Sequence, residues 1–123
     1  MKQKTIQLLV LSLAIIFSGC SKSNSSSPML EPAKIPSTVS QAFQSAPEET
    51  KQAVATFVET FQGQDAAGSF NQLRRLSAQE NLSAQQREAV AKAMQVTFTK
   101  LQESAQKGNT AAQSAMHDYL STR

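Results

Sequence analysis

The chain has too few residues of several types to build the commonest kinds of functional site. Its 123 residues include one cysteine, one histidine, one tyrosine and no tryptophan. A single cysteine excludes an intramolecular disulfide and a cysteine-based zinc site. The four glycines are scattered and form no glycine-rich phosphate-binding loop. We therefore expect no bound metal and no cofactor.

The ionisable side chains also form no pattern typical of catalysis. His117 stands beside Asp118, but neighbouring positions on a helix do not face each other. Glu48 and Glu49 suit the first turn of a helix, where negative charge is favourable. The other glutamates are scattered, so no acid/base pair is evident. We expect no catalytic residue and no enzyme activity unless a partner supplies the missing groups.

The beginning of the chain lacks acidic residues and has the composition of a secretory signal. Lys2 and Lys4 are basic, and no acidic residue precedes Glu31. The segment 6–17 is apolar except at two positions, and small residues follow it, as in a cleavable signal peptide. Twelve residues are too few for a membrane crossing, which needs about 20. The sequence therefore predicts export rather than a transmembrane helix.

The apolar segment ends in Phe17-Ser18-Gly19-Cys20, which resembles the lipobox of bacterial lipoproteins. Phe17 departs from the leucine that is most often found there. The resemblance implies diacylglyceryl transfer to the Cys20 thiol, cleavage between Gly19 and Cys20, and fatty acylation (palmitate) of the new amino group. An ordinary secretory signal followed by a free cysteine is the alternative. Because Ser21 follows the cysteine, the resemblance further implies the outer membrane, facing the periplasm, if the source is Gram-negative.

The sequence divides into three predicted parts. Residues 1–19 form the signal peptide, residues 20–40 a lipidated cysteine with a flexible Ser/Pro-rich tether, and residues 41–123 a helical domain. The tether is expected because its first part is low in complexity and its three prolines disfavour a helix.

Charge argues against a nucleic-acid partner. Cleavage of the signal removes Lys2 and Lys4, so the formal charge of +3 falls by two. Arg74-Arg75 is the only adjacent basic pair, and nucleic-acid binding normally needs a clustered basic surface. The expected partners are the membrane, through the lipid on Cys20, and a protein of the cell envelope. The oligomeric state is left open.

Apolar residues at helical spacing predict about four main helices in an all-α, antiparallel bundle. A short helix over 37–46 would carry Val39 and Phe43, and the next helix would follow Pro47. The remaining predicted core positions recur at three- and four-residue steps: Val54, Phe57, Val58, Phe61, Phe70, Leu73, Leu76, Val90, Met94, Phe98, Leu101, Ala105, Ala112, Ala115, Met116, Tyr119 and Leu120.

Polar residues and glycines mark where these helices begin and end. Asp65 and Asn109 are predicted N-caps, and Ser83 with Gln86 fits a capping box. Gly63 and Gly108 are predicted helix stops. Gly68 is expected to allow close approach to the preceding helix. Short connections then make neighbouring helices antiparallel.

The segment 57–76 loosely resembles a tetratricopeptide unit, because Gly63 and Asp65 separate a helix from a shorter one. The segment 84–120 has the same long-then-short arrangement around Gly108. The tryptophan, the proline and the regular spacing of about 34 residues are missing. A generic antiparallel bundle is therefore the preferred prediction.

Two functional hypotheses follow from these features. The preferred one is a non-catalytic binding or adaptor module that is held at a membrane by its lipid. The alternative is a structural or accessory envelope lipoprotein without a dedicated ligand, and a degenerate tetratricopeptide-like scaffold ranks below both. An exposed apolar groove larger than a few hundred Å² would favour the adaptor over the structural lipoprotein.

Overall fold

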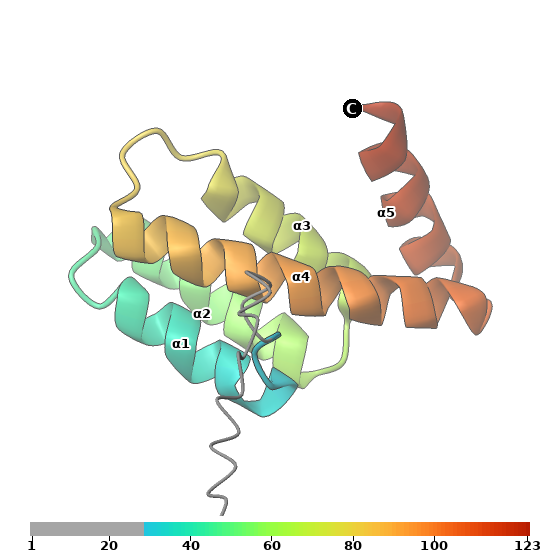
Figure 1. Cartoon of the computed structure of the whole chain (residues 1–123), viewed down its shortest axis with the longest axis horizontal. Helices are drawn as coiled ribbons and strands as arrows, with labels where there is room; N and C mark the ends of the chain where they lie inside the picture. The colour runs from blue at the N-terminus through green and yellow to red at the C-terminus, as the bar shows by residue number, and fades with distance from the viewer. Residues whose placement is uncertain (1–28) are drawn as a thin grey trace, which may run out of the picture.

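Five α-helices and one 3-10 turn make up residues 29–123, the part of the chain that this computed structural model describes (Figure 1). In chain order they are the 3-10 turn η1 (Pro32–Lys34), α1 (Ile35–Ala42), α2 (Glu48–Gln62), α3 (Ala66–Ser77), α4 (Ala84–Gln106) and α5 (Thr110–Ser121). No strand occurs between residues 29 and 123, so the all-α prediction is confirmed. The predicted signal peptide, Cys20 and the start of the predicted tether lie outside the described residues.

The long helix α4 forms the centre of the domain. It packs against α1, α3 and α5, while α2 packs against α1 and α3 (Figure 1). Helix α5 also packs against α3. As a result α3, α4 and α5 share one side of the molecule.

The folded domain begins earlier than the sequence predicts. A tether up to residue 40 is wrong for residues 32–40, and a domain boundary at 41 is too late. Pro32 opens η1 and Pro36 lies in the first turn of α1, where a residue without an N–H loses no hydrogen bond. Ile35 and Val39 are completely buried. These prolines mark the start of a helix instead of excluding one.

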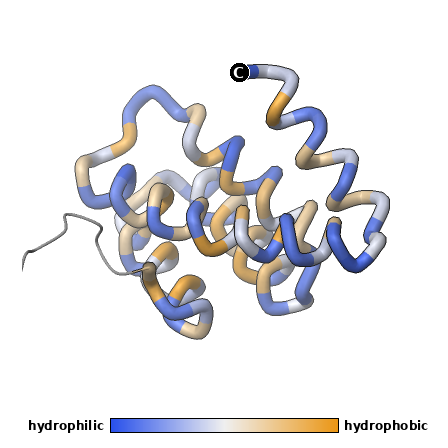
Figure 2. The backbone as a smooth tube through the Cα atoms, turned by 45° about the vertical axis from the view of Figure 1, so that its right-hand side comes forward, coloured by the Kyte–Doolittle hydropathy of each residue, from blue (hydrophilic) through white to orange (hydrophobic). Residues whose placement is uncertain are grey.

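Two adjoining apolar clusters form the core. The larger joins α1, α2, α3 and α4 and consists of Ile35, Val39, Phe43, Val54, Phe57, Phe61, Leu73, Leu76, Leu82, Val90, Ala93 and Val96. The smaller joins α3, α4 and α5 and consists of Phe70, Leu101, Ala105, Ala112 and Ala115. Met94 packs against both clusters. Figure 2 shows apolar and polar residues alternating along each helix, as expected of helices with one buried side.

Asp65 both ends α2 and begins α3. Its amide donates to the Thr60 carbonyl (2.9 Å), and the Gln64 amide donates to the Phe61 carbonyl (3.2 Å). These two bonds form a Schellman motif, in which Gln64 adopts a positive φ of 58°. The Asp65 carboxylate then accepts from the Gly68 amide at 2.9 Å, which confirms the predicted N-cap.

Asn109 repeats this arrangement between α4 and α5. Its amide donates to the Ser104 carbonyl (3.1 Å), and the Gly108 amide donates to the Ala105 carbonyl (3.0 Å). Gly108 supplies the positive φ, 89°. The Asn109 side chain accepts from the Ala112 amide at 2.9 Å, which confirms this cap as well. The two hairpins therefore share one turn design.

The shared turn predicts opposite effects for exchanges at its two equivalent positions. Gln64→Gly is expected to raise the free energy of unfolding by about 1 kcal/mol, because only glycine adopts a positive φ without steric cost. Gly108→Ala is expected to lower the free energy of unfolding by about 1 kcal/mol, because alanine has a steric cost at a positive φ. A β-carbon at this position meets no atom within 4 Å, so no clash with neighbouring atoms adds to that cost. Urea denaturation of both variants checks this, and equal signs would contradict it.

The α4 capping box is confirmed. The Gln86 amide donates to the Ser83 hydroxyl (3.1 Å), and the Ser83 amide donates to the Gln86 side-chain oxygen (2.9 Å). These bonds fix the start of α4 after the α3–α4 loop.

Two residues behave differently from their sequence patterns. A β-carbon at Gly68 would overlap the Asp65 carboxylate, so glycine at this position makes room for the cap. Leu120 does not face the core, because its side chain is 55% exposed. The inward stripe of α5 passes through Ala112, Ala115 and Tyr119, and Leu120 lies about 100° around the helix from Tyr119.

Candidate functional site: an arginine-lined groove

The residues with the strongest sequence signal are not described by the structure. Gly19 and Cys20, the predicted cleavage and lipidation positions, both lie outside residues 29–123. Lipid attachment therefore stays a prediction, and any site that the structure shows belongs to the helical domain.

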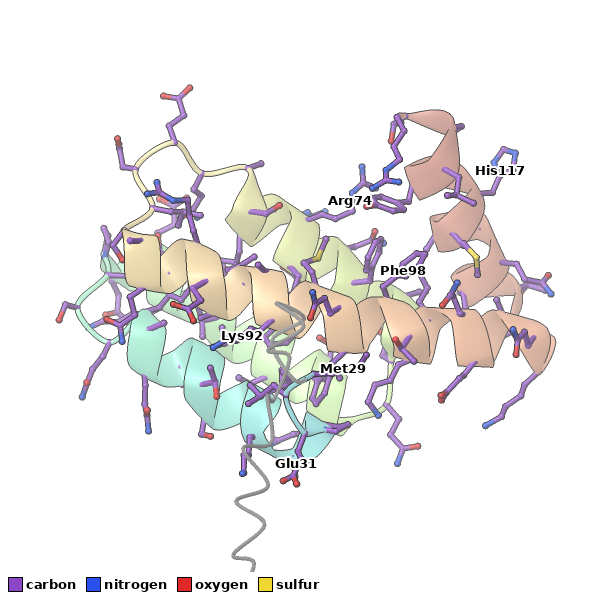
Figure 3. All side chains as sticks on the ribbon, in the orientation of Figure 1. Met29, Glu31, Arg74, Lys92, Phe98 and His117 are labelled. Carbon is purple, nitrogen blue, oxygen red and sulfur yellow. The ribbon has the colours of Figure 1, made fainter. Side chains whose placement is uncertain are left out.

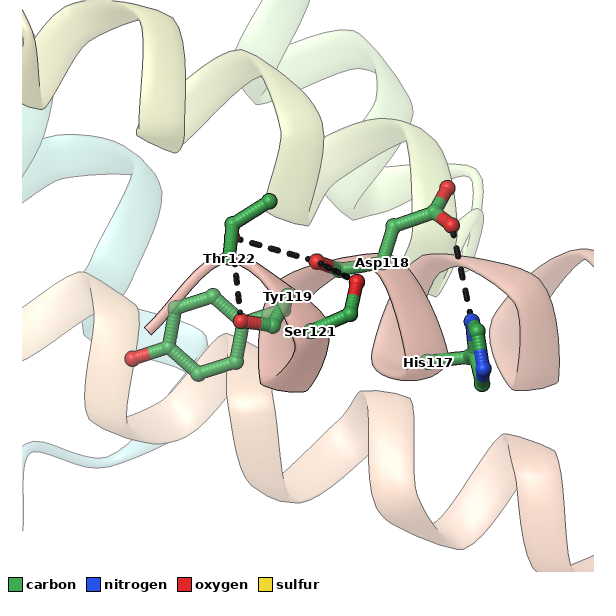
Figure 4. A network of polar contacts seen from close by, with 5 residues as sticks. All are labelled: His117, Asp118, Tyr119, Ser121 and Thr122. Atoms are coloured by element: carbon green, nitrogen blue, oxygen red, sulfur yellow. Dashed lines mark hydrogen bonds and ion pairs between the residues drawn. The ribbon is translucent and has the colours of Figure 1, made fainter.

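His117 lies on the outer surface of α5 (Figure 3). Its Nδ1 atom is 3.8 Å from the Asp118 carboxylate, and the two side chains are 83% and 68% exposed. In Figure 4 the Asp118 carbonyl accepts hydrogen bonds from the hydroxyls of Ser121 and Thr122, which close the last turn of α5. This exposed pair is described best as part of a helix end.

Charge interactions elsewhere are confined to the surface. Glu88 and Lys92 approach to 2.8 Å on α4, and the hydrogen bond and positive charge of Lys92 lower the pKa of the Glu88 carboxyl. Lys100 places its ammonium 5.4 Å from the centre of the Phe61 ring. Within residues 29–123, no group of three or more His, Cys, Asp or Glu side chains is arranged to hold a metal ion.

A groove between α3 and α4 is the most distinctive surface of the domain. A cavity of about 150 Å³ opens there, lined by Ser77, Leu82, Arg87, Val90, Ala91 and Met94. Arg87, Ala91, Met94 and Phe98 follow one another at four-, three- and four-residue steps, so they lie along one face of α4. From Arg87 to Phe98 this face of α4 spans about 16 Å, and the cavity lies beside its first two turns.

Aromatic rings close the end of the groove nearest α5. The Phe98 ring centre lies 5.9 Å from that of Phe70 and 5.6 Å from that of Tyr119. Phe70 and Tyr119 meet edge to face at 5.2 Å. Figure 3 shows Phe98 projecting from α4 into the space between α3 and α5. The three rings attach α5 to the rest of the domain and leave Phe98 and Tyr119 half-buried.

Three of the four arginines lie around this groove. The guanidinium carbons of Arg74 and Arg123 are 5.6 Å and 5.2 Å from the centre of the Tyr119 ring. At the opposite end, Arg87 donates a hydrogen bond to the Leu82 carbonyl at 2.8 Å. We use the name arginine groove for the surface formed by Arg74, Arg87, Ala91, Met94, Phe98 and Tyr119, with Arg123 beside it.

No arginine in the described part of the chain forms an ion pair with a carboxylate. The three ion pairs among residues 29–123 involve Lys34, Lys92 and His117. Guanidinium groups normally find planar acceptors such as carboxylates. The arginine groove thus combines half-buried apolar side chains with cations whose usual partner is not supplied by this domain.

Larger hollows exist but have less distinctive linings. One of about 640 Å³ lies between the α1–α2 turn and the α3–α4 loop, and Glu80 is its only charged residue. Another of about 230 Å³ lies beside the α2–α3 turn and is lined by Lys100, Glu103 and Lys107 among others. There positive and negative side chains occur together. A third hollow, of about 320 Å³, has an apolar lining of Phe43, Val54 and Ala55 but a single cation, Lys51, so the arginine groove is distinguished by the number of cations around it.

Comparison with known proteins gives no relative for this chain. No protein-family model matches it, and no curated protein or solved structure matches it either. The tetratricopeptide resemblance therefore rests only on the helix lengths and turns.

The arginine groove was not predicted from the sequence, although the helical spacing of its α4 residues is visible there. The role of Arg74 is not visible: it looks like Arg75 in the sequence, yet Arg74 is half-buried against Tyr119 while Arg75 is exposed. On α4, the spacing of Arg87, Ala91 and Met94 places them on one face. Which residues of α3 and α5 join that face depends on packing between distant segments.

The groove belongs to a domain whose helices show no membrane-spanning character. Among residues 29–123, no helix combines the length and apolar character that a bilayer crossing needs.

Proposed function

We propose that this chain is a lipid-anchored protein of the cell envelope whose helical domain is a non-catalytic binding or adaptor module. The arginine groove is the observation that carries the binding part of the proposal. It offers a half-buried apolar floor and arginines without carboxylate partners, on the side of the domain formed by α3, α4 and α5. Such surfaces are typical of sites that receive a partner helix.

The anchor part of the proposal is supported by the lipobox-like sequence ending at Cys20. Because the domain begins at η1, only residues 21–31 separate Cys20 from the first helical turn. A fully extended segment of that length reaches about 40 Å. A lipid on Cys20 would therefore keep the domain close to the bilayer surface, where envelope partners are concentrated.

The binding module can be tested by crosslinking in intact cells. A photo-crosslinking amino acid placed at Ala91 is expected to give one discrete protein adduct of the native, membrane-anchored chain. The same substitution at Ala55 on α2 is the control, since Ala55 is exposed as Ala91 is and lies outside the arginine groove. Adducts are separated by electrophoresis and identified by mass spectrometry.

The outcome separates the two functional hypotheses. An adduct from position 91 but not from position 55 supports a binding module. If neither position gives a discrete adduct, and gene deletion alters envelope integrity, a structural or accessory lipoprotein is favoured instead.

A further inference from the structure

We propose that the arginine groove binds an acidic, amphipathic helix of a partner protein. This inference deepens the proposed function and rests on it, because it names the chemistry of the partner that the binding module would take. Three properties of the groove support it: its charge, the spacing of its apolar floor and its shape.

The charge of the groove favours an acidic partner. Arg74 and Arg123 stand at the α5 end, and Arg87 stands at the other, so cations stand at both ends of the floor. Of the two lysines within α4, Lys92 is paired with Glu88, and Lys100 lies over Phe61, outside the groove. Arginine presents a planar fork that fits a carboxylate in two-point contact, which a lysine ammonium does not. A partner helix with carboxylates near both of its ends would supply the missing acceptors.

The spacing of the floor favours a helical partner. Ala91, Met94 and Phe98 lie at i, i+3 and i+7 on α4, so a helix laid along them meets apolar side chains at each turn. The cavity beside Ala91 and Met94 can receive an apolar side chain, because alanine leaves the space open. Methionine adapts its shape to different partners. A partner helix of about three turns matches the length of about 16 Å.

The shape of the groove favours a protein helix over a lipid surface. Met94, Phe98 and Tyr119 are half-buried in the floor, whereas a surface that inserts into lipid projects its apolar side chains outward. The most exposed large apolar residues of the described chain are Met29 and Leu120, and neither lines the cavity. The groove therefore receives side chains instead of inserting its own.

The test uses the full chain, purified with its lipid in detergent, and a displayed library of random helical peptides of about four turns. Enriched peptides are expected to be acidic overall and to carry apolar residues at three- and four-residue spacing. A synthetic peptide with the consensus sequence is then labelled, and its affinity is measured by fluorescence anisotropy. A scrambled peptide of the same composition is the control and should bind weakly.

Matched variants assign the binding to the groove. Arg74→Gln is expected to weaken the consensus peptide about tenfold, because a hydrogen-bonded charge contact is lost. Arg75→Gln, the control on the next residue, should leave the affinity within about twofold, because this side chain lies about 100° around α3 from Arg74. Ala91→Glu should weaken binding at least as much as Arg74→Gln, whereas Ala55→Glu should not. Circular dichroism confirms that each variant is folded.

Several results would overturn the proposal. Neutral or basic consensus peptides would contradict an acidic partner, and equal losses in Arg74→Gln and Arg75→Gln would contradict the site. Mixed micelles of detergent and phosphatidylglycerol that bind the full chain more tightly than detergent alone, no longer do so after Arg74→Gln, and displace every peptide would show that the groove takes a lipid. If the groove fails these tests while crosslinking from native membranes still gives a specific adduct, the binding module stands and only its partner chemistry is wrong.

Discussion

Phe57→Ala is expected to lower the free energy of unfolding by about 3–5 kcal/mol, as is typical when a fully buried phenylalanine is truncated. Phe57 has no exposed surface, and its ring packs 5.6 Å from that of Phe61 in the larger core cluster. Truncation leaves a cavity within the core cluster that joins the helices α1, α2, α3 and α4. A domain of this length has about 5–10 kcal/mol of stability in total, so the loss is a large part of it.

The measurement is thermal and urea denaturation followed by circular dichroism. The Tm should fall by roughly 15–30 °C if unfolding is two-state. Leu120→Ala is the control, because it removes a similarly large apolar side chain that is 55% exposed, and it should change stability by no more than about 0.5 kcal/mol. A Leu120→Ala loss as large as that of Phe57→Ala would contradict the described packing of α5.

Cys20→Ser is expected to abolish lipid attachment and signal-peptide cleavage of the exported chain. A hydroxyl cannot take the place of the thiol in diacylglyceryl transfer, so the precursor should remain uncleaved at Gly19 and carry no fatty acid. Stable attachment needs two or more acyl chains, and all of them depend on this residue in the proposed pathway. Incorporation of labelled palmitate and the mobility of the protein on gels report both steps.

Ser21→Ala is the matched control for the anchor, since it alters the neighbouring side chain and leaves the thiol intact. It should be processed and labelled as the unaltered chain is. If Cys20→Ser were still cleaved and labelled with palmitate, the lipobox interpretation would be wrong, and the ordinary secretory signal would take its place.

Features that depend on neighbouring residues could be predicted well from the sequence. The caps at Asp65, Ser83 and Asn109 are all present, because a side chain and the amide three residues further on decide each of them. Helix α2 was equally predictable, since its apolar residues recur at helical spacing and Val54 and Phe57 are buried. Local chemistry was sufficient for these elements.

Features that depend on packing between distant segments were predicted poorly. Pro36 disfavours a helix only in its interior, and its place in the first turn of α1 depends on Ile35 reaching the core. Leu120 follows the apolar pattern of α5, yet the face of α5 that contacts α3 and α4 does not include its side chain. The arginine groove needs three helices to meet, so no local pattern could specify it.

The double role of Asp65 and Asn109 also determines where this protein can be lengthened. Each residue ends one helix and begins the next, so an added residue at either turn would separate the Schellman bonds from the N-cap. The α3–α4 loop, from Ala78 to Ser83, has no such shared residue, and most of its positions are exposed. Epitope tags and fluorescent reporters therefore belong after Gln79 or Glu80, where a fused segment would leave both hairpins intact.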